Sequence, residues 1–203
     1  IQDRPVLYYS LKAFEDSAVD EIVLVVGKGE EEFCRKEIVD KYGISKVKAI
    51  VEGGKERYHS VFEGLKQTSD ADYVLIHDGA RPFVNQDIIR RCMLEVPEYQ
   101  ACVVGMPVKD TIKIADGGGY AKQTPDRKNV WMIQTPQTFS YALIYEAYEE
   151  MLKTEDTAIT DDAMVLERIK GKKSKLIEGS YRNIKITTPE DLLIANVYLQ
   201  HPE

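Results

Sequence analysis

Apolar and polar positions along the chain follow two alternating periods. Short apolar runs rich in Val, Ile and Leu are typical of strands buried on both faces, and they lie at residues 21–27, 47–52, 73–76 and 101–108. Apolar residues recur at helical spacing at 6–14, 30–42, 57–67 and 85–94. Gly43 is a favourable C-cap for the second of these helices. Four such units in succession predict an α/β fold with helices on both faces of a parallel sheet.

The alternation stops after residue 108. Two strand-like runs, 110–114 and 120–124, flank Asp116-Gly117-Gly118-Gly119 and predict a β-hairpin whose glycines adopt positive φ. A glycine triplet also suggests a phosphate-binding loop, but such loops open helices. Because an isolated hairpin buries little surface, residues 109–130 are expected to form a projecting arm that packs against a partner subunit.

The rest of the pattern is helical with one interruption. Helices are predicted at about 141–153 and 161–169, followed by a short strand pair and a last helix from Pro189. The sequence contains no internal repeat, low-complexity segment or flexible linker. Residues 1–203 are therefore expected to form a single domain.

Composition narrows the class of protein. Hydrophobic residues make up 43% and charged residues 30%, as in an ordinary globular protein, and no apolar run approaches the roughly 20 residues of a membrane helix. The 34 acidic residues outnumber the 27 basic ones, a balance that disfavours a nucleic-acid partner. The three cysteines (Cys34, Cys92 and Cys102) lack metal or disulfide spacing, which favours a cytoplasmic location.

Candidate chemistry follows two predicted strands, because ligands of open parallel sheets bind at the carboxyl ends of the strands. Gly53-Gly54-Lys55-Glu56-Arg57, followed by Ser60, lets a backbone approach a ligand, although a plain turn has the same pattern. In His77-Asp78-Gly79-Ala80-Arg81, the carboxylate suits Mg²⁺ and the guanidinium suits a phosphate. A structural Asp–Arg ion pair is the alternative, and His77 is expected to be packed and hydrogen-bonded rather than a general base.

Further charged residues lie near later strand ends: Lys109, Lys113, Arg127 and Lys185. Thr160-Asp161-Asp162 begins a predicted helix, where Thr160 or Asp161 alternatively serves as an N-cap. Basic and acidic groups gathered at strand ends of an acidic protein predict a phosphorylated substrate and a divalent metal.

Five segments together resemble one enzyme family: 53–61 with its Gly-Gly-Lys-Glu-Arg, 76–83 with its Ile-His-Asp-Gly-Ala-Arg-Pro-Phe, 107–113, 124–139 and 183–191. The chain resembles the bacterial 2-C-methyl-D-erythritol 4-phosphate cytidylyltransferases over essentially its whole length. The resemblance implies a Rossmann-like three-layer nucleotidyltransferase fold with a mostly parallel sheet. It also implies transfer from CTP to methylerythritol phosphate with release of pyrophosphate, dependence on Mg²⁺, and a homodimer held by interlocked β-arms.

Carried over motif by motif, the resemblance implies a role for each candidate residue. The nucleotide-binding residues are Gly54, Ser60, Asp78 and Gly79, and Asp78 is also the metal ligand. The substrate-binding residues are Arg81, Thr111, Arg127, Thr160 and Lys185. Three of these groups, Asp78, Arg127 and Lys185, are the expected catalytic residues. Thr111 and Arg127, at the two ends of the arm, are expected to reach into the pocket of the partner subunit.

One departure from the family concerns the start of the chain. Family members begin with a strand and a glycine-rich loop whose arginine, with a following lysine, cradles the triphosphate, and residues 1–7 match the segment just after it. The natural protein is therefore expected to be longer, and this 203-residue species to be inactive or nearly so. A ribitol 5-phosphate cytidylyltransferase is the main alternative, disfavoured by Gly79-Ala80 and Asp126-Arg127. A non-catalytic nucleotide-binding homologue is the second alternative.

Overall fold

The computed structural model describes residues 1–154 and 158–201. The helices are α1 (Val6–Glu15), α2 (Glu31–Cys34), α3 (Arg57–Leu65), α4 (Gln86–Tyr99), α5 (Tyr141–Met151), α6 (Asp162–Lys170) and α7 (Pro189–Gln200). A π-helical segment, η1 (Arg35–Asp40), continues α2, and η2 (Arg127–Asn129) is a 3₁₀ turn. The strands are β1 (Ile22–Val26), β2 (Val47–Glu52), β3 (Tyr73–Ile76), β4 (Ala101–Pro107), β5 (Ile114–Ala115), β6 (Ala121–Gln123), β7 (Trp131–Ser140) and β8 (Lys175–Glu178).

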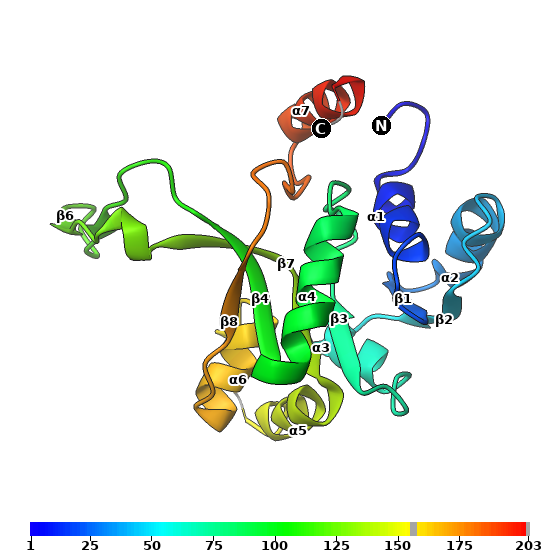
Figure 1. Ribbon diagram of the computed structural model, residues 1–203, viewed down its shortest axis with the longest axis horizontal. Coiled ribbons are helices and arrows are strands. Elements are labelled where there is room, and N and C mark those ends of the chain that lie inside the picture. The colour runs from blue at the N-terminus through cyan, green and yellow to red at the C-terminus, as the bar shows by residue number, and fades with distance from the viewer. Residues whose placement is uncertain (155–157, 202–203) are drawn as a thin grey trace.

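The larger sheet has the strand order β3-β7-β4-β8 (Figure 1). Strand β7 runs antiparallel to both β3 and β4, whereas β4 and β8 are parallel. Three of the four strands therefore share one direction, and β1 and β2 form a separate parallel pair. The predicted α/β architecture with mostly parallel strands is confirmed.

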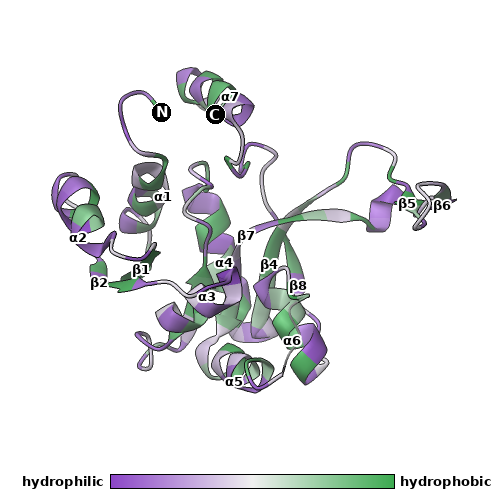
Figure 2. Ribbon diagram, turned by 180° about the vertical axis from the view of Figure 1, so that it is seen from behind, coloured by the Kyte–Doolittle hydropathy of each residue, from purple (hydrophilic) through white to green (hydrophobic). Residues whose placement is uncertain are grey.

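Helices cover both faces of the larger sheet, and β4 contributes to both cores. Ala101 and Val103 pack with α3, α5 and α6 on one face. Cys102 and Val104 pack with α1 and α4 on the other. This alternation is the reason that β4 reads as one continuous apolar run, which Figure 2 shows as a hydrophobic strand inside a more polar shell.

A cavity of about 1340 Å³ lies between β1 and β3, the neighbouring edge strands of the two sheets. Apolar side chains of both strands line it, and Gly53, Gly54 and Asp78 also border it. Gly53 directly follows β2 and Asp78 follows β3 by two residues, so the cavity reaches the carboxyl ends of both strands, where the sequence places its candidate chemistry.

Strand β7 is the main element that the hydrophobic pattern does not predict. Its centre, Gln134 to Thr138, is polar and contains Pro136, yet these residues are buried. Proline has no N–H for a sheet ladder. The pairing of β4 with β7 is irregular between Val103 and Gly105, opposite the stretch that holds Pro136, so the strand accommodates the proline there.

Smaller differences concern element ends. Helix α4 continues through Pro97 to Tyr99, beyond the predicted end near residue 94, and ends at Gln100 with a φ of 62°. The strand pair predicted before α7 is the single strand β8, which pairs with β4. No helix among the described residues is long and apolar enough to cross a membrane.

The arm leaves the larger sheet between β4 and β7 and extends to one side (Figure 1). Its hairpin, β5 with β6, is shorter than predicted, and nearly all arm side chains are exposed. The turn is only partly as expected: of the three glycines only Gly119 has a positive φ, of 83°, and Asp116 accepts hydrogen bonds from the N–H groups of Gly118 and Tyr120.

Candidate active site

The loop after β3 is held by a chain of neutral hydrogen bonds. Nε2 of His77 lies 3.1 Å from the carbonyl oxygen of Arg81, which only accepts, so Nε2 carries the proton. Nδ1 of His77 then accepts from the hydroxyl of Thr135 at 2.9 Å, and that hydroxyl accepts from the N–H of Asp78 at 3.1 Å. Burial lowers the pKa of His77 to about 4. The histidine is thus a neutral structural residue, as predicted.

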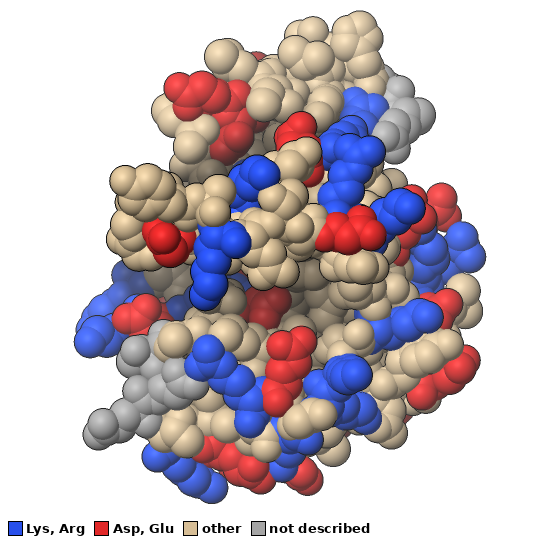
Figure 3. Space-filling model, turned by 90° about the vertical axis from the view of Figure 1, so that its left-hand side faces the viewer, with Lys and Arg blue, Asp and Glu red and all other residues tan. Residues whose placement is uncertain are grey.

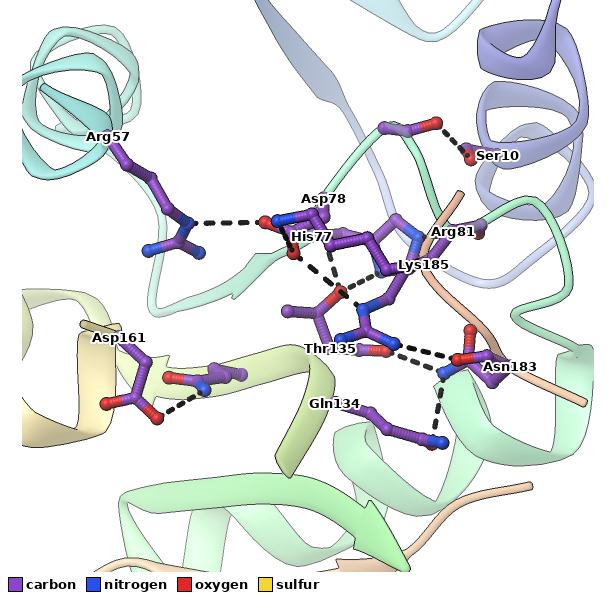
Figure 4. A network of polar contacts seen from close by, with 12 residues as sticks. Ser10, Arg57, His77, Asp78, Arg81, Gln134, Thr135, Asp161, Asn183 and Lys185 are labelled. Carbon is purple, nitrogen blue, oxygen red and sulfur yellow. Dashed lines mark hydrogen bonds and ion pairs between the residues drawn. The ribbon is translucent and has the colours of Figure 1, made fainter. Parts of the chain in front are cut away.

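Three cationic side chains face the Asp78 carboxylate (Figure 4). Nε of Arg57 donates to Oδ1 at 3.2 Å. Lys185 Nζ and Arg81 Nε lie 3.1 and 3.7 Å from Oδ2. Burial by itself raises the pKa of Asp78, but the positive charge of Arg57, with that of Lys185, outweighs it and lowers the pKa. Asp78 is therefore an anion at neutral pH.

The segment that carries Lys185 is fixed to this loop by Asn183, which is fully buried. The side-chain amide of Asn183 donates to the carbonyl of Thr135 at 2.9 Å, and the backbone carbonyl of Asn183 accepts from Nη1 of Arg81 at 2.8 Å. One residue past Lys185, the N–H of Ile186 donates to the carbonyl of Ala80 at 2.9 Å. These contacts bring Lys185, about one hundred positions from Asp78 in the sequence, beside that carboxylate.

The loop after β2 packs against the start of α3. The N–H of Gly54 donates to the Ser60 hydroxyl at 3.1 Å. A Cβ on Gly53 would lie 2.6 Å from that hydroxyl oxygen, and a Cβ on Gly54 would lie 3.2 Å from the backbone carbon of His59. Gly54 is thus required by its close approach to the backbone of α3, whereas Gly53 lies against the side chain of Ser60, and both glycines border the cavity together with Ser60.

Three residues at the start of α6 have different environments: Thr160, Asp161 and Asp162. Asp161 is the N-cap, because its carboxylate accepts from the N–H of Met164 at 2.9 Å. Thr160 is exposed and contacts only the sulfur of Met164 among the contacts described for its side chain. Asp162 is completely buried and receives both Nη groups of Arg57, at 3.0 and 2.8 Å. The N-cap alternative therefore holds for Asp161.

Thr111 and Arg127 lie outside this cluster. Nη1 of Arg127 donates to the carbonyl of Lys109 within the arm, at 3.1 Å. Among the described residues, neither Thr111 nor Arg127 forms a hydrogen bond or ion pair with Asp78. The face that carries the arm has many basic side chains among acidic ones, with a hollow across its middle (Figure 3).

The sequence assigns no role to four residues that support the site: Arg57, Thr135, Tyr148 and Asp162. Arg57 follows the glycine loop directly, so its place in the motif was the available signal. Its partner Asp162 is 105 residues away, and no local pattern announces such a pair. The polar run in β7 was the signal for Thr135, because buried polar side chains in a central strand need partners.

Comparison with known proteins identifies the family of the chain. The sequence profile of the IspD family, 2-C-methyl-D-erythritol 4-phosphate cytidylyltransferase, matches residues 1–201. The enzyme of that name from Lachnospira eligens is 52% identical over 202 residues, covering 98% of this chain and 88% of the relative. That from Lachnoclostridium phytofermentans is 49% identical over 200 residues, covering 98% and 86%.

Solved structures give the same result. The 4-diphosphocytidyl-2C-methyl-D-erythritol synthase of Anaerococcus prevotii superposes with a TM-score of 0.90 at 38% identity, covering 99% of this chain and 88% of that chain. The cytidylyltransferase of Thermus thermophilus gives a TM-score of 0.82 at 32% identity, covering 98% and 90%. These likenesses confirm the Rossmann-like nucleotidyltransferase fold. The chain belongs to the 2-C-methyl-D-erythritol 4-phosphate cytidylyltransferase family, and its reaction joins CTP and methylerythritol phosphate to give 4-diphosphocytidyl-2-C-methyl-D-erythritol and pyrophosphate in isoprenoid biosynthesis.

Proposed function

We propose that Asp78, Arg81 and Lys185 form the centre at which the two phosphate groups meet. The observation that carries this proposal is the convergence of cations on Asp78 in a protein of net charge −7. Arg57 is also neutralised by Asp162, so Arg81 and Lys185 share one carboxylate and leave one positive charge for an anionic ligand. Gly54, Ser60 and Gly79 border the adjoining cavity, where we place the cytidine.

The reaction needs positioning and positive charge more than a base. An oxygen of the methylerythritol phosphate attacks the α-phosphorus of CTP, a new P–O bond forms, and the bond to the bridging oxygen breaks as pyrophosphate leaves. Negative charge grows on the leaving group, and Arg81 and Lys185 are the groups that would stabilise it. The attacking phosphate is already ionised at neutral pH, so the neutral, internally bonded His77 is not required as a base.

A divalent cation such as Mg²⁺ fits the donor set through Asp78. Among the residues that the structure describes, no group of three or more His, Cys, Asp and Glu side chains is suited to hold a metal alone. Mg²⁺ in nucleotide sites is typically bound by one or two carboxylates together with substrate phosphates. Asp78 would supply that carboxylate, and the ion would neutralise charge on the triphosphate. The side chain of Lys185, which contacts Oδ2 of Asp78, is 42% exposed and has room to move aside.

The arm is proposed to build a homodimer whose sites are shared. The arm residues bury little of their surface within one chain. Ile114 and Tyr120, for example, are 46% and 77% exposed. We assign Thr111 and Arg127 to the methylerythritol phosphate pocket of the partner subunit, and Thr160 to the pocket of its own subunit. The reaction is placed in the cytoplasm, consistent with three buried free thiols.

Pyrophosphate release by the complete gene product tests the centre. CTP and a divalent cation are supplied with methylerythritol phosphate or ribitol 5-phosphate, and turnover is expected with the first alone. Lys185→Gln should lower kcat by about 10²-fold or more, the usual cost of one transition-state donor. Lys41→Gln, which removes an exposed lysine paired with Glu37, should leave kcat unchanged. Equal rates for the two variants would refute the assignment of Lys185.

Mixed dimers test the shared site. Arg127→Ala and Lys185→Ala should each be nearly inactive alone. If Arg127 acts in the partner's pocket, a mixed dimer has one site with both defects and one with neither. Equal mixing with subunit exchange should then restore about a quarter of the wild-type rate, because half of the dimers are mixed and half of their sites are intact. No recovery, despite exchange shown by native mass spectrometry, would place Arg127 in the site of its own subunit.

A further inference from the structure

An ionic network of Arg57, Tyr148 and Asp162 adjoins the candidate centre. The reaction as described so far gives this network no role. Asp162, at the first turn of α6, is completely buried. Oδ1 of Asp162 receives Nη1 of Arg57 at 3.0 Å and the hydroxyl of Tyr148 at 2.5 Å, and Oδ2 receives Nη2 of Arg57 at 2.8 Å. Tyr148 in α5 is itself fully buried. All three donors thus point at one carboxylate.

The geometry of Arg57 connects this network to Asp78. Its guanidinium is planar and rigid, so the two Nη contacts with Asp162 also set the direction of Nε. Nε points at Oδ1 of Asp78, 3.2 Å away. With Oδ1 held in this way, Oδ2 is left facing Lys185 and Arg81. Figure 4 shows Arg57 and Lys185 approaching Asp78 from opposite sides.

Stability alone is a weak reason for such a network. Removing a carboxylate and a guanidinium from water costs free energy, and replacing buried ion pairs by apolar groups is often neutral or stabilising. Burial by itself lowers the pKa of Arg57, but the charge of Asp162 outweighs it, so the pKa of Arg57 is raised. Arg57 therefore keeps its positive charge and its two Nη contacts with Asp162.

We propose that Tyr148 and Asp162 are positioning residues that orient Arg57 and, through it, the Asp78 carboxylate. This inference rests on the proposed role of Asp78 and adds two residues that do not touch substrate. When the fork is loosened, Asp78 is free to turn and to pair more closely with Lys185 and Arg81, which removes positive charge from the transferring phosphate. The expected defect lies in kcat, because the interaction lost is made in the transition state.

The chain offers a matched control for this test. Tyr141 lies on the same helix α5 and packs against the same core as Tyr148. Its hydroxyl donates to the carbonyl of Leu65 at 3.3 Å, away from Arg57. Each of the two variants, Tyr148→Phe and Tyr141→Phe, deletes one hydroxyl and one hydrogen bond. Only Tyr148→Phe affects the proposed relay, which we define as the contacts from Tyr148 through Asp162 and Arg57 to Asp78.

Steady-state kinetics of the complete gene product should separate the two variants. Tyr148→Phe is expected to lower kcat about 3- to 10-fold, and Asp162→Asn by more than 10-fold, with the KM for CTP within about 2-fold of wild type. Tyr141→Phe should leave both constants unchanged. In an Arg57→Lys background, which lacks the fork, Tyr148→Phe should lower kcat further by less than about 2-fold. Equal effects of the two tyrosine variants, or a full effect of Tyr148→Phe in that background, would overturn the proposal.

A second readout does not depend on turnover. The Nε–H group of Arg57 gives an NMR signal in ¹⁵N-arginine-labelled protein, which Arg57→Lys identifies by its loss. Tyr148→Phe and Asp162→Asn should shift or broaden this signal, whereas Tyr141→Phe should leave it in place. An unchanged signal in Tyr148→Phe would overturn the relay even if the protein turns over. A shifted signal in a protein without cytidylyltransferase activity would support the relay and refute the proposed function.

Discussion

Replacing Thr135 with Val tests whether the Asp78 loop is held by side-chain hydrogen bonds from β7. Thr135 is 3% exposed. Its hydroxyl accepts from the N–H of Asp78 at 3.1 Å and donates to Nδ1 of His77 at 2.9 Å. Valine has nearly the same shape but neither accepts nor donates. The substitution therefore leaves two polar groups without partners while it keeps the packing of the strand.

The size of the effect follows from those two groups. A buried donor or acceptor that loses its partner costs about 1–3 kcal/mol, so the two groups together cost about 2–6 kcal/mol. Asp78 and His77 are of intermediate burial, so we take the lower end of this range. A loss of about 2 kcal/mol with a urea m-value of about 2 kcal/mol/M moves the unfolding midpoint down by about 1 M.

Urea unfolding followed by circular dichroism measures this shift, and Thr138→Val is its matched control. Thr138 is completely buried on the same strand, but its hydroxyl has no hydrogen-bond partner among the described residues. Thr138→Val should therefore leave the midpoint unchanged or raise it, since an unpaired hydroxyl is replaced by a methyl group. Equal midpoints for the two variants, with unchanged m-values, would refute the hydrogen-bond assignment at Thr135.

Three further predictions concern other parts of the chain. Gly54→Ala brings a Cβ to 3.2 Å from the backbone of α3 and should weaken CTP binding measured by calorimetry at least about 10-fold, whereas Gly117→Ala, which meets open space, should not. Burial raises the pKa of Glu15, but its hydrogen bonds outweigh this and lower it; the stability it contributes is present above the unfolded pKa of 4.5 and is lost as pH falls through the lower folded value. Between pH 6 and 3, the free energy of unfolding should therefore fall less steeply for Glu15→Gln than for the wild type. Equal slopes for the two proteins would count against this role of Glu15. Burial raises the pKa of Cys92 to about 11 and that of Cys102 to about 12, so a disulfide reagent at pH 8 should label these thiols only on unfolding; rapid labelling of the native protein would contradict their burial.

The parts of the fold that were predictable are those in which local pattern and burial agree. Strands β2 and β3 begin and end at the predicted residues, because both are short apolar runs between turn residues. Strand β7 was missed because its buried centre is polar. Gln134 donates to the carbonyl of Ser180 at 2.8 Å, and Gln137 links Asp161 to the N–H of Ala163. The polarity of β7 serves the loops around the site, and its partners are distant in sequence.

The candidate site was predictable to the same extent. Strand-end reasoning and motif resemblance both place three residues near one another: Asp78, Arg81 and Lys185. The structure brings them together. Arg57 contacts Asp162, and the packing of α3 against α5 and α6 brings that pair together. Thr111 and Arg127 are proposed to act in the pocket of a partner subunit, and a single chain does not test that proposal.

Two networks of different chemistry therefore support the Asp78 carboxylate, one through the backbone and the other through the side chain. Neutral hydrogen bonds from Thr135 and Asn183 hold the backbone on either side of the centre, whereas charged contacts from Arg57 hold the side chain of Asp78. Loss of a neutral bond leaves buried groups unpaired and lowers the free energy of unfolding. Loosening of the charged fork leaves the fold packed but lets the carboxylate turn toward its cations. Variants of the first kind should therefore be recognised by their unfolding midpoints, and variants of the second kind by kcat.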